Sequence, residues 1–557
     1  MIGMTALLPI SVMLPLLGAG LALLFRRAPA AQRIVSVSAL AIQLATEVAM
    51  VVGIDADGTI VMHLGGWAAP VGIALVADRF AAILMVVSTV VTLAVLVYAI
   101  AQQRGGQTGD GSAAVFHPAM LIMAAGVSNA FIAGDLFNLF VSFEILLTAS
   151  YVLLTMGGTA ERLRAGAPYL VVSLLSSIIF LSAIALVYSA TGTVNLADLA
   201  RRIGDLAPGL AAVLQSLLLL AFGIKAAVWP MSAWLPDSYP SAPAPVTAVF
   251  AGLLTKVGIY AIIRTQTLLF GGHGFTTLLM WAALATMIIG ILGAVAQGDI
   301  KRMLSFTLVS HIGYLLFGVA LDSTAGLTAT VYYVVHHILV QTALFLAAGL
   351  IEYLSGTTAV DRLGGLARRA PLLAVLFFVP AMNLGGVPPL SGFLGKIGLF
   401  EAGFAAGGTL PVMVVVGGTV TSLLTLYAMV RVWGRAFWRP APTEQAAPSG
   451  SVATSERPST AAAERAERIT AVTETAVTET AVTETAVTET AVTETASRTA
   501  VSRDRPPRGM LAATAAVVLA GVLLTVAAGP LYALAGRAAD DLAHPDRYVT
   551  AVLGVNP

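Results

Sequence analysis

Residues 222–264 read FGIKAAVWPMSAWLPDSYPSAPAPVTAVFAGLLTKVGIYAIIR, and this stretch decides the fold. It begins and ends in apolar segments that each carry one lysine, Lys225 and Lys256, and five prolines separate the two segments. Proline lacks an N–H and clashes with the preceding turn, so no uninterrupted helix can cross the middle of this stretch. A broken helix among apolar residues is tolerated where it is buried in protein or lines a water-filled cavity.

The composition places the chain in a lipid bilayer. Of its 557 residues, 58% are hydrophobic and 11% are charged, whereas soluble domains carry about 25% charged residues. The net charge of +1 argues against a nucleic-acid partner. Cysteine is absent, which excludes disulfides, thiolate-bound iron–sulfur clusters and Cys-type zinc sites. No glycine-rich nucleotide loop stands between a strand and a helix. We therefore expect no cofactor, no metal and no catalytic residues.

A membrane-spanning helix needs about 20 mostly apolar residues. Fourteen such blocks begin near residues 6, 34, 77, 114, 136, 166, 210, 244, 276, 303, 326, 372, 410 and 510. No block alternates as a barrel strand would. The sequence thus predicts an all-α polytopic membrane protein with about fourteen transmembrane helices.

Basic residues predict the orientation, because cytoplasmic loops collect Lys and Arg. With the N-terminus outside, the inside loops hold most of the loop arginines, and the outside loops before residue 435 hold chiefly Arg201 and Arg202. We expect a multi-pass protein of the plasma membrane with both termini outside. The expected inside residues are Arg26, Arg27, Arg33, Arg104, Arg162, Arg164, Lys301, Arg302, Arg362, Arg368 and Arg369.

Residues 440–508 differ in kind from the rest of the chain. They are rich in Pro, Ala, Ser, Thr and Glu, and TAVTE occurs five times in residues 470–494. A period of five places Val and Glu on no fixed helical face, and little apolar surface is available to offset the entropy of ordering. The segment is predicted to be a disordered cytoplasmic linker.

The lysines indicate function. The chain has only four, and three of them, Lys225, Lys256 and Lys396, lie inside apolar blocks. Arginine cannot usefully lose its proton, whereas lysine can. A charge at mid-membrane costs at least about 2.5–3.5 kcal/mol, so it requires a function or a partner, and Glu144 is the candidate counter-charge. The alternative is a Lys–Glu pair that only fixes helix packing, with the other lysines reaching an interface.

Histidines add further candidate proton carriers, because each ring can both accept and donate a proton near neutral pH. His311 and His337 lie inside apolar blocks. For either one alone, a hydrogen-bonded packing role is the competing interpretation. His336 is adjacent to His337 and is expected to point about 100° away around the helix.

A second broken block precedes Lys396. Residues 383–396 read NLGGVPPLSGFLGK, which contains two adjacent prolines and several glycines. Half-helices recur in transporters built from inverted repeats around an ion path. Ordinary proline kinks are the alternative, but each break adjoins a buried lysine.

These motifs resemble the antiporter-like family shared by Mrp-type Na⁺/H⁺ antiporters and proton-pumping subunits of respiratory complex I. The resemblance covers roughly residues 70–435, and the D-type subunits of Mrp antiporters match best in length and in residues 236–265. It implies two inverted five-helix repeats, each with a broken helix. The stretches that carry it are FVSFEILLTASYVLL, residues 222–264, DIKRMLSFTLVSHIGY, HHILVQTALFLAAGLIE and GGVPPLSGFLGKIGLF.

The expected organisation follows from this resemblance. Residues 1–113 hold the first three helices, 114–270 the first repeat, 271–439 the second repeat, 440–508 the linker, and 509–557 the last helix with a short tail. The resemblance also implies a proton path, for which Gln341 makes the step from His337 more dependent on water. The path residues are Glu144, Lys225, Lys256, His311, His337 and Lys396.

The expected function is a proton- and cation-translocating subunit of a hetero-oligomeric Na⁺/H⁺ antiporter, with other membrane subunits, protons and Na⁺ as partners. One alternative is a proton-pumping, non-redox subunit of an NADH:quinone oxidoreductase or a related hydrogenase complex. A structural membrane scaffold is disfavoured by the buried lysines.

Overall fold

The computed structural model describes residues 2–104, 110–272, 275–440 and 505–554. The predicted linker with its TAVTE repeats lies almost entirely outside the described residues. Within them, thirteen helices are long and apolar enough to cross a membrane. These are α2 (Leu7–Leu24), α3 (Pro29–Asp57), α4 (Arg79–Arg104), α5 (Asp110–Ile132), α6 (Leu136–Thr155), α7 (Ala160–Thr191), α9 (Pro208–Ala226), α11 (Ala244–Leu268), α12 (Thr276–Ala296), α13 (Ile300–Ala320), α14 (Thr324–Ser355), α18 (Thr409–Val432) and α21 (Arg508–Val526).

A fourteenth crossing is made by two shorter helices in series, α16 (Pro371–Gly385) and α17 (Ser391–Ala406). This confirms the all-α polytopic fold. The remaining elements are short: α1 (Ile2–Thr5), β1 (Ile60–His63), η1 (Leu64–Gly66), β2 (Ala74–Ala77), α8 (Leu196–Arg202), η2 (Ile203–Asp205), α10 (Trp234–Ser238), η3 (Tyr239–Ser241), η4 (Val360–Arg362), α15 (Leu366–Arg369), η5 (Trp433–Trp438), α22 (Ala528–Ala543) and α23 (Pro545–Leu553).

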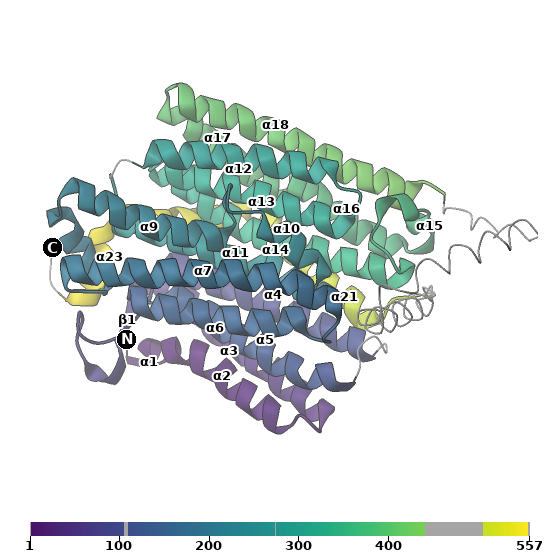
Figure 1. The fold of residues 1–557 in the computed structure, drawn as a ribbon, viewed down its shortest axis with the longest axis horizontal. Helices are drawn as coiled ribbons and strands as arrows, with labels where there is room; N and C mark the ends of the chain where they lie inside the picture. The colour runs from purple at the N-terminus through teal and green to yellow at the C-terminus, as the bar shows by residue number, and fades with distance from the viewer. Residues whose placement is uncertain (1, 105–109, 273–274, 441–504, 555–557) are drawn as a thin grey trace, which may run out of the picture.

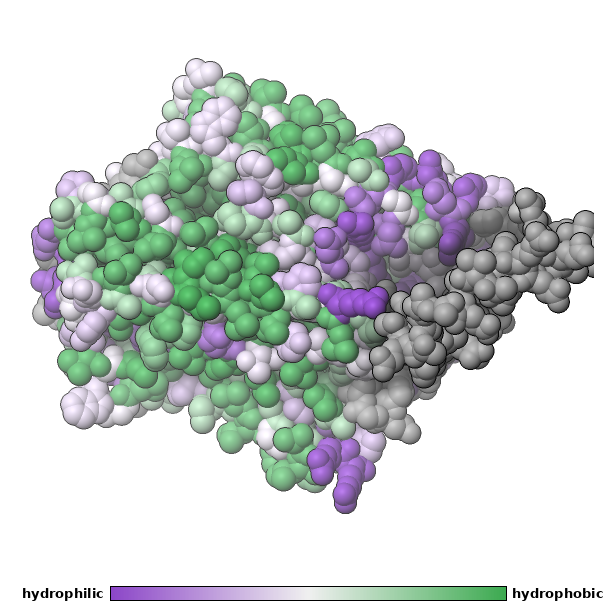
Figure 2. Space-filling model, in the orientation of Figure 1, coloured by the Kyte–Doolittle hydropathy of each residue, from purple (hydrophilic) through white to green (hydrophobic). Residues whose placement is uncertain are grey.

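The long helices run roughly side by side, and both ends of the chain lie at the same end of the bundle (Figure 1). We call this the terminal end; it also carries the β1–β2 hairpin and α23. The opposite end includes α15 and the start of α21. We call it the basic end, because the arginines that the sequence predicts to be cytoplasmic lie there, at the ends of their helices. Hydrophilic residues gather at the basic end, whereas an apolar surface covers α7 and α9 between the two ends (Figure 2).

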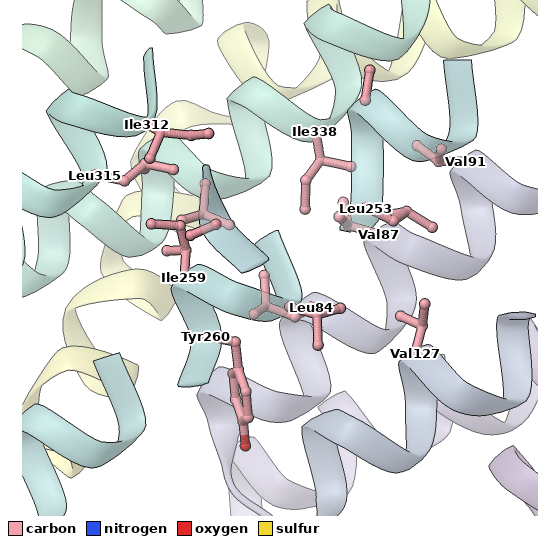
Figure 3. Close-up of a cluster of buried hydrophobic side chains, with 14 of the residues drawn as sticks. Leu84, Val87, Val91, Val127, Leu253, Ile259, Tyr260, Ile312, Leu315 and Ile338 are labelled. Carbon is pink, nitrogen blue, oxygen red and sulfur yellow. The ribbon is translucent and has the colours of Figure 1, made fainter. Parts of the chain in front are cut away.

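Helices α11, α13 and α14 form the centre of the bundle. Their apolar windows are almost entirely buried and that of α5 is nearly so, whereas only a third of each window of α2 and α3 is buried within this chain. Figure 3 shows the apolar packing where α4 meets this interior: Leu84 and Val87 lie near Leu253 of α11, with Ile338 of α14 nearby. Lys256 of α11, His311 of α13 and His337 of α14 therefore lie in the buried interior of the bundle.

Several local features occur twice along the chain. The link between α5 and α6 pairs with the segment after α7 through Asp135 and Asn195, and the link between α12 and α13 pairs with the segment after α14 through Asp299 and Ala359. Asp135 and Asp299 each cap the helix that follows. The helices α7 and α14 are both 32 residues long and both end at a left-handed glycine.

The two sets lie at opposite ends of the bundle. Because consecutive long helices alternate in direction, the α5–α6 link falls at the terminal end and the α12–α13 link at the basic end (Figure 1). This is the arrangement that inverted repeats require. The division into residues 114–270 and 271–439 stays a prediction that these features favour.

A buried ion pair anchors the terminal end. Arg264 at the end of α11 bonds Asp78, which directly precedes α4, at 2.6 Å, and both side chains are at most 5% exposed. The guanidinium also lies over the ring of Tyr548 in α23. Burial alone would raise the pKa of Asp78, but Arg264 and the N–H of Ala81 hold this pKa below its ordinary value.

Arg79 continues this network to the C-terminal helices. Its guanidinium bonds Asp55 of α3 at 3.0 Å and Asp541 of α22 at 2.7 Å, and Arg537 of α22 also bonds Asp55 at 2.8 Å. From sequence, Asp78 and Arg79 are expected to lie near helix ends and to pair with each other or with a neighbouring subunit, with interfacial anchoring as the alternative. The structure shows instead that they join α3, α4, α11 and α22 within this chain.

Replacing Asp78 by Asn should destabilise the protein by about 3–5 kcal/mol, because it leaves the buried Arg264 charge without its partner. A lowered folded pKa means that this stability is present above the ordinary Asp pKa of about 3.9 and is lost as the pH falls through the folded value. The thermal midpoint of purified D78N should therefore lie well below that of wild type at pH 7, and the two should converge in acid. Equal midpoints at pH 7 would contradict an anchoring role for this pair.

The matched control is Asp361→Asn. Asp361 bonds Arg435 at 2.7 Å, but its side chain is 74% exposed. An exposed pair contributes little to stability. The thermal midpoint of D361N should stay close to that of wild type.

Candidate functional site

The first helix break lies directly beside Lys225. Helix α9 ends at Ala226, and Ala227 adopts a left-handed conformation with a φ of 58°. The N–H groups of Ala227 and Val228 donate to the carbonyls of Ile224 and Gly223, which closes the last turn. The chain resumes as the short helix α10 and the turn η3 before α11 begins. The proline-rich run thus ends a helix at the lysine, as the sequence predicts.

Lys225 is held by neutral groups. Its ammonium donates to the hydroxyl of Ser177 at 3.1 Å and to the carbonyl of Ser173 at 3.5 Å, both on α7. It also lies 5.3 Å from the ring centroid of Phe143 on α6. A cavity of about 30 Å³ adjoins it, lined also by Tyr169 and Trp234. This volume is near that of a single water molecule, so the ammonium has room for one.

Glu144 follows Phe143 on α6 but does not touch Lys225. Among the described residues no ion pair within 4 Å involves Glu144, and its buried Oε1 atom has no hydrogen-bond partner. The residue before it, Phe143, lies against the Lys225 ammonium. The two groups expected to pair are therefore neighbours in an open arrangement.

Lys256 is fully enclosed. It lies in the middle of α11 with no exposed surface, and its ammonium donates to the carbonyl of Ala251 at 2.6 Å. No acidic side chain in the described ranges bonds it. A buried lysine that lacks a counter-charge is costly to keep charged, which favours a role for its uncharged form.

The second break is closed by Asn383. Helix α16 ends at Gly385, Gly386 is left-handed with a φ of 81°, and α17 begins at Ser391. The Oδ1 atom of Asn383 accepts from the N–H of Gly392 at 2.8 Å, and its amide donates to the Ser391 hydroxyl at 3.1 Å. One side chain of the first half-helix thereby caps the second.

Lys396 reaches back across this break. Its ammonium donates to the carbonyl of Leu384 at 2.9 Å and lies 5.1 Å from the ring centroid of Tyr314. The carbonyl belongs to the last turn of α16, where the helix dipole favours a positive charge. Tyr314 itself bonds the carbonyl of Gly418 at 2.5 Å, so α13, α16, α17 and α18 meet around this lysine.

The two predicted histidines lie together. The rings of His311 and His337 stack with centroids 5.2 Å apart, and Nδ1 of His311 bonds the hydroxyl of Tyr333 at 2.8 Å. The Nε2 atom of His311 and both ring nitrogens of His337 have no hydrogen-bond partner among the described residues. Unpartnered nitrogens in a buried polar cluster are places where a water molecule or a proton would be bound.

His336 is the residue that sequence reasoning missed. It points away from His337, and this direction carries it to the second break, where its Nδ1 bonds the Ser391 hydroxyl at 3.0 Å. Its ring also stacks on Tyr333, with centroids 5.1 Å apart. In the sequence, His336 and His337 follow Tyr333 by three and four residues, which makes their side chains neighbours on a helix. This spacing was the sign that His336 belongs to the same cluster.

The predicted residues therefore fall into groups. Lys225 and Glu144 stand at the first break, and His311, His337 and Lys396 stand near the second. Lys256 lies on α11 between them in sequence and is bonded to the carbonyl of Ala251. No metal-binding group of three or more acidic or histidine side chains exists among the described residues.

Gln341 lies on the same helix as the histidines but takes no part in their contacts. Its amide donates to the carbonyl of Leu304 at 2.7 Å, while its Oε1 atom has no partner in the described chain. A neutral side chain fixed on a carbonyl cannot carry charge from His337 toward Lys396. Any such step relies on Tyr333, His336 or water.

Residues 133–425 match the family described as NADH:quinone oxidoreductase/Mrp antiporter, transmembrane. The D subunit of the Na(+)/H(+) antiporter of Alkalihalophilus pseudofirmus is 40% identical over 440 residues, which cover 78% of this chain and 87% of that protein. The protein of the same name from Bacillus subtilis is 39% identical, with 77% and 86% covered. The chain belongs to the NADH:quinone oxidoreductase/Mrp antiporter family.

Solved structures agree with this family. A chain of the Mrp complex from Dietzia sp. DQ12-45-1b is similar over its whole length, with a TM-score of 0.83 and 34% identity. A chain of the membrane-bound sulfane sulfur reductase, an archaeal respiratory membrane complex, has a TM-score of 0.80 at 24% identity over 99% of both chains, which shows a shared fold alone. Since its named relatives are antiporter subunits, this family member is a transporter subunit and not an enzyme.

Asn383→Ala should lower the stability of the protein by about 1–3 kcal/mol, because it leaves the buried N–H of Gly392 without its acceptor and removes one of the two partners of the Ser391 hydroxyl. The measurement is the thermal unfolding midpoint in detergent. Ser305→Ala is the control, since that buried hydroxyl bonds only a carbonyl of its own helix. If N383A and S305A melt at the same temperature, Asn383 does not hold the second break together.

Proposed function

We propose that this cation-translocating membrane subunit belongs to a multisubunit Na⁺/H⁺ antiporter and moves protons along Glu144, Lys225, Lys256, His311, His337 and Lys396. Other membrane subunits of the complex are its partners, as the relatives named as D subunits of Na(+)/H(+) antiporters and the Mrp complex suggest. The chain lies in the plasma membrane with both termini outside and residues 440–508 in the cytoplasm. On this orientation, the basic end faces the cytoplasm.

The bonding of the lysines is the observation that carries this proposal. Lys225, Lys256 and Lys396 each donate to a hydroxyl or a carbonyl, and none of them bonds a carboxylate among the described residues. An ammonium held only by neutral acceptors can lose its proton without leaving a buried acid unpaired. A structural lysine would instead be expected to have an acidic partner.

The fourth lysine provides the contrast. Lys301, at the basic end of α13, bonds Glu352 of α14 at 2.6 Å, so it is the lysine with a carboxylate partner in the described chain. Both residues line a cavity of about 620 Å³ at the basic end. This cavity lies beside the start of α11 and gives water access toward the interior from the cytoplasmic side.

The path begins with the open pair at the first break. When Glu144 approaches Lys225, the ammonium is stabilised, and when the pair separates, the buried charge loses that support and the proton moves on. Lys256 receives the proton through water near the first break. Because coupled groups titrate together, the pair acts as one unit and not as two independent sites.

The second half of the path is more continuous. From Lys256 the proton passes to the stacked rings of His311 and His337. The hydroxyl of Tyr333 bonds His311 and its ring stacks on His336, so Tyr333 connects these two histidines. The chain of contacts then continues through Ser391 to the break that holds Lys396. Lys396 exchanges the proton with one side of the membrane.

A proton-pumping subunit of an NADH:quinone oxidoreductase or hydrogenase complex is the second candidate. The matched family includes both antiporters and oxidoreductases, and the fold is shared with a chain of an archaeal respiratory complex. The 40% identity to a subunit named for a Na(+)/H(+) antiporter favours the antiporter.

Lys225→Ala and Lys396→Ala should each abolish Na⁺-dependent proton exchange, because each removes a proton carrier beside a helix break. The assay uses everted vesicles from an antiporter-deficient host that expresses the full operon, with assembly of the complex checked by blotting. Full exchange in both assembled variants would mean that these lysines carry no protons and have a structural role. If wild type shows quinone-linked proton pumping and no exchange, the second candidate is correct.

Tyr333→Phe should slow exchange about tenfold, which corresponds to about 1.4 kcal/mol in the rate-limiting step, because it removes the hydroxyl bonded to His311. The adjacent Tyr332→Phe is the matched control, since that hydroxyl bonds only the carbonyl of Leu524. Rates are compared in the same vesicles at equal amounts of complex. Equal rates in Y333F and Y332F would exclude the tyrosine from the path.

A further inference from the structure

Glu47 stands outside every group described so far. It lies on α3, ten residues before the helix ends at Asp57, which is about 15 Å at 1.5 Å per residue. That distance is half the thickness of the hydrocarbon core, and the side chain has no exposed surface. A carboxyl group at this depth is costly unless it is neutral or paired.

Neutral polar groups surround Glu47. Its Oε1 atom accepts from the amide of Gln43 at 2.9 Å and from the hydroxyl of Ser128 at 3.2 Å. The same amide contacts the hydroxyls of Thr89 at 3.3 Å and Ser128 at 2.9 Å. The cluster therefore joins α3, α4 and α5, and each of the four side chains is at most 2% exposed.

Two oxygen atoms in the cluster have no partner among the described residues. They are Oε2 of Glu47 and Oε1 of Gln43, and both are buried. A carboxylate offers only acceptors, whereas a protonated carboxyl group donates one hydrogen bond. A proton on Glu47 would supply the donor that the cluster lacks. The amide N–H groups of Gln43 point into the cluster and disfavour the binding of a metal cation there.

No charge elsewhere in the described chain neutralises the group. The helix α2, which packs on α3, carries no ionisable side chain. On α4, Arg79 bonds Asp55 and Asp541 at the terminal end, and Tyr98 bonds a carbonyl of α14. Further ionisable groups with described side chains on α3 and α5 are Arg33, Asp57 and His117, and no ion pair or hydrogen bond joins any of them to Glu47.

An apolar layer separates this cluster from the lysine and histidine path. Thr89 faces Glu47, but Leu84, Val87 and Val91 of the same helix α4 pack toward Leu253 and Ile338 (Figure 3). Lys256 lies on α11, beyond this layer. In the described ranges, no hydrogen bond or ion pair joins this cluster to the lysines and histidines of the path.

We propose that Glu47 is a second proton-binding site, in which the carboxyl group holds a proton among Gln43, Thr89 and Ser128 and releases it during transport. The protonated group donates from Oε2 within the cluster, and release leaves a carboxylate that accepts from the Gln43 amide and the two hydroxyls. The site belongs to α3, α4 and α5 and not to the path. Its role in exchange rests on the proposed function, whereas its protonation does not.

Infrared spectroscopy tests protonation directly. The purified complex in lipid is titrated, and the C=O stretch of protonated carboxyl groups is compared between wild type and Glu47→Gln. Wild type should show a band that is lost in E47Q and that weakens in alkali, while Thr89→Val should shift the band without removing it. Glu352→Gln is the matched control and should leave the band in place. Identical wild-type and E47Q spectra would overturn the proposal.

Transport tests the role of that proton. Glutamine keeps the size and hydrogen bonds of the side chain but cannot release a proton, so E47Q should reduce Na⁺-dependent exchange at least fivefold or shift its pH profile. Glu47→Asp keeps an ionisable carboxyl group, so its Na⁺-dependent exchange should again depend on pH. This variant also provides the test if E47Q assembles poorly. Unchanged rate and pH profile in assembled E47Q would overturn a role in transport. If wild type shows no exchange at all, the proposed function fails while the infrared result still decides the site.

Discussion

A polar group inside a bilayer must find its partners within the protein, because the hydrocarbon offers none. This constraint explains both the regular and the irregular parts of the chain. Most of the backbone satisfies itself in long helices, and the two breaks are closed by specific substitutes, the tight turn after Ala226 and the Asn383 side chain. The same constraint acts on charges: Arg264 has Asp78, whereas Lys256 has only a carbonyl among the described residues.

The helix breaks give the buried lysines a common setting. Each break adjoins one lysine, and Lys396 donates to a carbonyl in the last turn before the second break. Lys225 uses the α7 backbone and a serine instead. Acceptors of this kind hold an ammonium without fixing its charge, since no carboxylate is left unpaired when the proton departs. On the proposed path, the lysines that carry protons are thus different groups from the Arg264–Asp78 pair that anchors the terminal end.

The sequence was sufficient for the fold class and for the positions of both breaks, because helix length and proline chemistry are local properties. Side-chain contacts between helices depend on helix rotation, which no local pattern gives. For that reason the sequence predicts a Glu144–Lys225 pair that the structure shows apart, and the spacing of His336 from its neighbours does not say that it contacts the second break. Glu47 is equally hidden, because no proline or lysine lies near it in the sequence.

Lys256 offers the most direct test of the proposed path, since it is fully buried, bonded to a carbonyl and placed between the two breaks. Lys256→Met keeps the length and apolar stem of the side chain but cannot hold a proton. The measurement is Na⁺-dependent proton exchange in vesicles with equal amounts of assembled wild-type and K256M complex. We predict that K256M assembles and shows no exchange. Exchange at the wild-type rate in assembled K256M would contradict a proton path through the buried lysines.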